Sequence, residues 1–278
     1  MLRVTIAALA LASLSGMPAA AQDASAWDKE LHAAARLIAG SIIETDDATL
    51  LRAGIEIRLE PGWHTYWRDP GDSGAPPTFD FAGSENVKSV TVLWPAPARF
   101  PDGAGGHFIG YKRNVIFPLR IVPNDAARGS AIHLKLAYAV CEKLCVPADA
   151  NLTLALPGTS GANERVLVTA EARVPRSVSL GAGDGLAIRS AHHEGSGEHE
   201  RVVVDVAAPD GVPVDLFAEG PTPEWSLPLP ELIGGESGIR RFAFDLEGLP
   251  PGAHPNGAKL TFTAVSPDDA IEVVTQIE

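Results

Sequence analysis

Residues 137–149 read AYAVCEKLCVPAD and contain Cys141 and Cys145, the two cysteines of the 278-residue chain. Apolar residues recur at every second position before the pair, over 132–140, and after it, over 152–156, as in strands with one buried face. A straight strand would hold the two cysteines roughly 13 Å apart, whereas a disulfide needs Cα atoms within about 7 Å. If the two sulfurs meet, the chain must bend between them, as two strands joined by a short turn would do.

The spacing of the cysteine pair leaves three interpretations open. The first is a redox pair, in which one thiolate attacks a partner and the second thiol resolves the mixed disulfide. The second is a structural staple, although closing a five-residue loop gains only about 2 kcal/mol in the chain-entropy model. The third is a Cu(I) site, because two thiolates and a histidine suit a soft metal ion. The candidate third ligands are His64, His107 and His133.

Short apolar or alternating segments bounded by turns recur along the whole chain, which contains 27 Gly and 23 Pro. Such a pattern predicts an all-β protein of the sandwich type. Pro118 indicates that the strand containing it lies at the edge of a sheet or has a bulge. The pattern of residues 32–43 is ambiguous and fits either a helix or a strand. The further predicted strands are 53–59, 87–94, 115–121, 186–189, 202–206, 214–218, 242–246, 260–265 and 271–277.

The sequence PGTSG at 157–161 is the best candidate for a linker. It predicts two β-sandwich domains in tandem, 22–157 with the cysteine pair and 158–278 without recognisable chemistry. The first residues, MLRVTIAALALASLSGMPAAAQ, have the form of a secretory signal peptide cleaved after Ala21. Export places the cysteines where disulfides form and persist.

The charge and hydropathy of the chain exclude several classes of partner. A formal net charge of −13 argues against nucleic acids and against anionic membrane surfaces. No second apolar segment of about 20 residues follows the signal, so we expect a soluble mature protein that does not span a membrane. Nucleophile-elbow and phosphate-binding glycine motifs are also missing.

Several segments, taken together, resemble a known family. They are PGWHTYW at 61–67 with PGD at 70–72, WPAP at 94–97, GY at 110–111 and YAVCEKLCVP at 138–147. In order and spacing they resemble the N-terminal periplasmic domain of the thiol:disulfide interchange protein DsbD, and more closely the related domain of the suppressor-of-copper-sensitivity protein ScsB. The resemblance covers about 50–157.

This resemblance implies an immunoglobulin-like β-sandwich with a redox-active Cys141–Cys145 pair at one end, in the periplasm and without a cofactor. In such domains the pair receives electrons from a membrane-embedded module and passes them to periplasmic thioredoxin-fold proteins. By analogy Cys145 is the partner-facing thiol. The present cysteine spacing is shorter than in DsbD itself. The chain also lacks the membrane segments and the thioredoxin-like domain, so we expect a separate membrane protein as electron donor.

The family also has a loop whose aromatic residue caps the disulfide. Here the matching loop is 101–111, which makes Phe108 the expected cap, with Tyr111 or Tyr66 supporting it. Asp102 lies in the same loop and matches the family's nearby acid.

Overall fold

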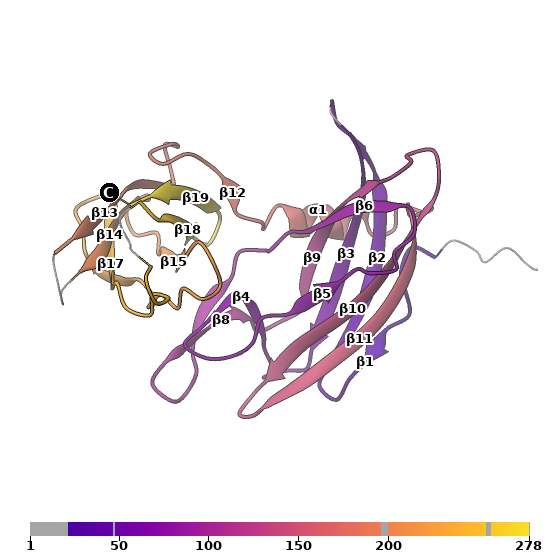
Figure 1. Ribbon diagram of the computed structural model, residues 1–278, viewed down its shortest axis with the longest axis horizontal. Helices are drawn as coiled ribbons and strands as arrows, with labels where there is room; N and C mark the ends of the chain where they lie inside the picture. Colours follow the sequence, from indigo (N-terminus) through magenta and orange to yellow (C-terminus); the bar gives the residue numbers. More distant parts are fainter. Residues whose placement is uncertain (1–21, 47, 196–199, 254–256, 278) are drawn as a thin grey trace, which may run out of the picture.

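The computed structural model describes residues 22–277 apart from 47, 196–199 and 254–256. The predicted signal peptide, 1–21, lies outside the described residues. Strands make up almost all of the regular structure, and they form two β-sandwiches that follow one another along the chain (Figure 1). No helix in the described part is long and apolar enough to cross a membrane.

The first sandwich consists of two large sheets and a small third one. In order, the five strands of the first sheet are β1 (Asp28–Lys29), β2 (Ala33–Glu44), β3 (Thr49–Leu59), β9 (Val115–Pro123) and β6 (Val87–Val92). The second sheet contains β11 (Cys145–Leu156), β10 (Ser130–Cys141) and β5 (Thr78–Asp80). The small sheet contains β4 (Thr65–Gly71), β8 (His107–Tyr111) and β7 (Ala98–Pro101), and it extends toward the second sandwich (Figure 1).

Alternation along the strands fills the first core. Every second residue of β10 and β11 is buried, and these side chains meet those of β2, β3 and β9 in one hydrophobic cluster. Two antiparallel sheets packed through one face each are the arrangement of an immunoglobulin-like sandwich. The predicted all-β, immunoglobulin-like class is therefore confirmed.

The second sandwich has two four-stranded sheets around a separate hydrophobic cluster. The first sheet contains β12 (Arg176–Ser177), β19 (Ala270–Gln276), β18 (Lys259–Val265) and β15 (Asp215–Glu219). The second contains β13 (Ala187–Glu194), β14 (Arg201–Ala207), β17 (Ile239–Asp245) and β16 (Glu231–Gly234).

Helix α1 (Glu164–Glu171) follows the predicted linker but packs against the first sandwich. Its Leu167 is fully buried over Gly40 and Gly54, where a Cβ on either glycine would overlap the leucine side chain. Arg52 of β3 forms ion pairs with Glu164 and Glu171 at the two ends of the helix. The chain therefore leaves the first sandwich only after α1.

The expectation of an edge strand or a bulge at Pro118 is wrong. Strand β9 lies between β3 and β6, and its pairing with β3 is regular across Gly54 and Pro118. The Pro118 carbonyl accepts a hydrogen bond from the N–H of Leu93, just after the end of β6. The nitrogen of the proline is on the same side as its carbonyl and so faces Leu93, just beyond β6, which leaves the pairing with β3 intact.

Candidate functional site

The cysteine pair closes the longest hairpin of the fold. Strands β10 and β11 pair without interruption from Ser130 opposite Leu156 to Cys141 opposite Cys145. The two cysteines are joined by a disulfide with a Cα–Cα distance of 4.1 Å. The bend expected between the two cysteines is confirmed as the tight turn of this hairpin, which lies at one end of the first sandwich (Figure 1).

The two cysteines differ sharply in exposure. Cys141 is 2% exposed, whereas Cys145 is exposed on the surface. Beside it, Leu144 is 79% exposed at the turn. An approaching thiolate therefore has access to the sulfur of Cys145, while the sulfur of Cys141 is covered by protein.

Tyr66 of β4 contacts both sulfurs. Its hydroxyl lies 2.9 Å from Sγ of Cys141 and 3.3 Å from Sγ of Cys145. Burial raises the pKa of Tyr66, so the hydroxyl stays protonated and available as a donor. Gly74 leaves room for the ring, since a Cβ at that position would overlap it.

Phe108 of β8 shares a hydrophobic cluster with Tyr66 and Cys141, and Phe100 of β7 packs against that cluster. Phe108 is 3% exposed, and its ring lies edge-on to Tyr66 with the centroids 6.0 Å apart. Phe100 lies directly opposite Phe108 in the sheet, with the ring centroids 5.1 Å apart. Three aromatic rings thus gather around the buried cysteine.

His64 is a site residue that the sequence suggested only as a copper ligand. Its backbone exchanges two hydrogen bonds with Cys141, of 2.9 and 3.0 Å, and its ring stacks on Phe108 at 3.8 Å. Burial, assisted by the charge of Lys112, lowers the pKa of His64 to about 4. The signal for this position was present, because alternation puts His64 and Tyr66 on the same face of an extended segment.

Two residues of the expected capping loop have other contacts. Tyr111 belongs to the main core of the first sandwich, and its hydroxyl donates a hydrogen bond of 2.8 Å to the carbonyl of Pro95. Asp102 accepts hydrogen bonds from the backbone N–H groups of Ala104 and Gly106, at 2.8 and 3.0 Å, within its own turn. These bonds hold the pKa of Asp102 below its usual value.

The copper alternative finds no ligand set in the described residues, which contain no group of three His, Cys, Asp or Glu side chains able to hold a metal ion. His133 lies in the middle of the hairpin, where its ring contacts Thr153 Oγ1 at 3.3 Å. His107 lies at the start of β8, and its backbone N–H donates to Asp72.

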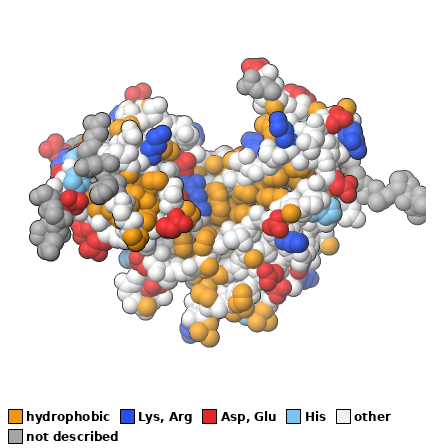
Figure 2. Space-filling view, in the orientation of Figure 1, with side chains coloured by type: hydrophobic (Ala, Val, Ile, Leu, Met, Phe, Trp, Pro, Cys, Tyr) orange, Lys and Arg blue, Asp and Glu red, His pale blue; other side chains and the backbone are white. Residues whose placement is uncertain are grey.

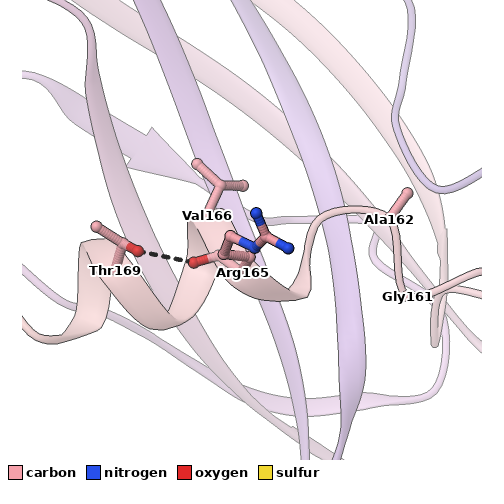
Figure 3. Close-up of a pocket in the computed structure, with 5 residues that line it drawn as sticks. All are labelled: Gly161, Ala162, Arg165, Val166 and Thr169. Atoms are coloured by element: carbon pink, nitrogen blue, oxygen red, sulfur yellow. Dashed lines mark hydrogen bonds between the residues drawn. The ribbon is translucent and has the colours of Figure 1, made fainter.

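A hollow on the surface beside α1 lies apart from the disulfide. Its wall includes Arg165 and Thr169, whose hydroxyl donates to the carbonyl of Arg165 (Figure 3). The other lining residues are Gly161, Ala162 and Val166. Neither cysteine contributes to it, so we place the candidate site at the tip of the hairpin.

The fold and the disulfide together define an immunoglobulin-like domain with a thiol–disulfide site at the end of a hairpin. Residues 36–157 match the family model described as "Thiol:disulfide interchange protein DsbD, N-terminal". This match confirms the resemblance to the DsbD N-terminal domain that was found in the sequence.

The structure is also similar to the crystal structure of the N-terminal periplasmic domain of ScsB from Proteus mirabilis. The TM-score is 0.71 at 21% sequence identity, and the match covers 92% of this chain and 98% of the other. The shared fold thus extends over both sandwiches. The comparison with curated proteins gave no match.

Proposed function

We propose that this protein is a periplasmic thiol:disulfide exchange protein that passes electrons through Cys141 and Cys145 to or from thioredoxin-fold proteins. The observation that carries the proposal is the asymmetry of the disulfide, with an exposed Cys145 and a buried Cys141 under Tyr66. An exchange site needs one accessible sulfur and a second sulfur protected from outside attack. A staple has no need of such asymmetry.

The exchange proceeds in two displacements. The thiolate of reduced Cys145 attacks a disulfide of the partner, forms a mixed disulfide and releases the partner's other sulfur as a thiolate. The thiolate of Cys141 then attacks Sγ of Cys145, which restores the intramolecular disulfide and releases the second partner sulfur. Two electrons pass to the partner, whose two thiolates take up two protons. Electron flow in the other direction reverses these steps.

The surrounding residues set the selectivity of the exchange. The Tyr66 hydroxyl is 2.9 Å from Sγ of Cys141, so it donates a hydrogen bond to the thiolate formed on reduction. Phe108 and Phe100 keep small thiols away from the covered side of the disulfide. A protein partner gains access through the exposed side, at Cys145.

The match of 36–157 to the DsbD N-terminal family model supports the choice of thioredoxin-fold partners and of a separate membrane-embedded protein as electron donor. The ScsB domain, which is periplasmic by its description, and the predicted signal peptide support the same compartment for this chain. We further propose that 22–157 is the exchange domain, with α1 packed against it, and that the sandwich formed by the rest of 158–278 is a second domain supporting it.

The reduction potential of the Cys141–Cys145 pair tests the proposal. It is measured by equilibrating the protein with dithiothreitol or glutathione buffers and trapping free thiols. Structural disulfides of secreted proteins have potentials below about −300 mV, and exchange-active ones have higher values. We expect a value above that limit, while a value well below it would reduce the pair to a staple.

The order of attack is tested with two single variants. Cys141→Ser keeps the exposed thiol and removes the resolving one, so it is expected to accumulate a mixed disulfide with a thioredoxin-fold partner. Cys145→Ser is the matched control and is expected to trap none, because its remaining thiol is 2% exposed in the native fold. Equal trapping by both variants contradicts the assignment of Cys145 as the attacking thiol.

A further inference from the structure

The small sheet of β4, β8 and β7 covers the disulfide with one of its two faces. Phe100 is paired with Phe108, and Tyr66 with Gly110, two residues beyond Phe108. Because side chains alternate along a strand, Tyr66, Phe100 and Phe108 belong to the same face of this sheet. We refer to the three strands as the cap sheet.

The opposite face of the cap sheet meets the second sandwich. Trp67 follows Tyr66 in β4, and its ring lies 5.7 Å from that of Phe217 in β15. Both rings are buried, with at most 1% of either residue exposed. Phe217 is part of a strand of the second sandwich, but its side chain packs into the main hydrophobic cluster of the first sandwich.

Two arginines of the cap sheet extend this contact. Arg68 of β4 forms ion pairs with Glu219 of β15, at 2.6 Å, and with Glu272 of β19. Arg99 of β7 pairs with Asp215 at 2.9 Å and also donates to the backbone carbonyls of Leu216 and Pro230, both at 3.0 Å.

These arginines are partly enclosed, because only 26% of the Arg68 side chain and 18% of the Arg99 side chain are exposed. Burial alone would lower the pKa of Arg68, but Glu219 and Glu272 raise it above its usual value. Hydrophobic side chains gather in the hollow between the two halves, with charged ones beside them (Figure 2). Ion pairs in such a partly enclosed place fix geometry better than fully solvated ones.

We propose that the second sandwich holds the cap sheet over the disulfide, with Arg68 and Arg99 as the positioning residues. Each arginine lies on the same short strand as an aromatic cap residue, within two positions of Tyr66 or next to Phe100. A sheet of three short strands has little stability of its own, so its position depends on what it packs against. The inference rests on the proposed function only in taking Cys141–Cys145 as the site that the cap sheet protects.

The test measures how fast dithiothreitol reduces the disulfide in the full-length protein. Arg68→Gln is expected to speed the reduction at least about fivefold, because loss of a partly buried ion pair favours opening of the cap sheet. Arg99→Gln is also expected to speed the reduction. The reduction rate of Arg68→Lys is expected to lie between that of Arg68→Gln and that of the unchanged protein. All rates are measured at a temperature where circular dichroism shows each variant folded.

The matched control is Arg241→Gln, which makes the same change of charge and breaks the Arg241–Asp205 pair inside the second sandwich. It is expected to leave the reduction rate unchanged. If Arg68→Gln behaves like this control, the proposal is overturned.

A double variant separates positioning from general destabilisation. In a Phe108→Ala background the cap is already open, so adding Arg68→Gln should have no further effect on the reduction rate. A full additional effect there would show that Arg68 acts by another route, against the proposal. Dithiothreitol needs no protein partner, so failure of Cys141→Ser to trap a partner would contradict the proposed function while leaving this measurement intact.

Discussion

At the scale of single residues, the hydroxyl of Tyr66 lies 2.9 Å from Sγ of Cys141 and donates a hydrogen bond to it. Tyr66→Phe removes a donor that stabilises the thiolate of the reduced form more than the disulfide. The reduction potential should therefore become more negative by about 30 mV, which corresponds to one hydrogen bond to a charged group.

The control for this change is Tyr138→Phe, on β10. The buried Tyr138 hydroxyl has no hydrogen-bond partner among the described residues. Its removal should leave the reduction potential as it is. Equal shifts in both variants would show that the Tyr66 hydroxyl has no special relation to the sulfurs.

His64 predicts a pH dependence at the same site. Its pKa is lowered to about 4 from the usual 6.5, so between these values the unfolded chain binds a proton that the folded protein does not. The His64 contribution to stability is thus present above about pH 6.5 and is lost as the pH falls toward 4. His64→Gln should flatten the dependence of the unfolding free energy on pH in this window.

Denaturant unfolding at a series of pH values measures this slope, and the NMR titration of the His64 ring measures the pKa directly. A titration midpoint near the ordinary value of histidine would contradict the burial of the ring under Phe108.

At the scale of elements, helix α1 is fastened to the first sandwich by Leu167, which has no exposed surface. Leu167→Ala leaves a cavity over Gly40 and Gly54 and should lower the free energy of unfolding by about 2–5 kcal/mol. Val168→Ala is the control, since Val168 is 47% exposed on the same helix and should change little. If urea unfolding shows that both variants lose a similar amount of unfolding free energy, α1 does not pack as described.

Two strands show what the periodicity of apolar residues cannot predict. Residues 32–43 fitted a helix through the spacing of Trp27, Leu31, Ala35 and Ile38, and a strand through the alternation of Leu37 and Ala39 with Arg36 and Ile38. Their pairing decides the matter, since Leu37 lies opposite Ile55 of β3. The prediction of an edge strand at Pro118 was wrong because the local sequence does not show that β6 pairs with the far side of this strand.

At the scale of the whole molecule, Phe217 joins the two halves by packing into the first core from strand β15. We expect the protein to unfold in one cooperative thermal transition. Phe217→Ala should separate it into two, because it opens a cavity at the junction. Differential scanning calorimetry makes the measurement. Two widely separated transitions in the unchanged protein would contradict tight coupling between the halves.

The β class, most strand positions and the hairpin with the cysteines at its turn could be predicted from the sequence, because they depend on alternation and turn residues that are local in the chain. Through the resemblance it also pointed to Phe108 and Tyr66.

Three features became visible only in the folded molecule: the burial of Cys141, the stacking of His64 on Phe108 and the place of Tyr111 in the core. The fold alone brought Arg68 to Glu219 and Glu272, partners 151 and 204 residues away along the chain. Such contacts depend on how finished sheets pack against each other, and no periodicity within a single strand records that packing.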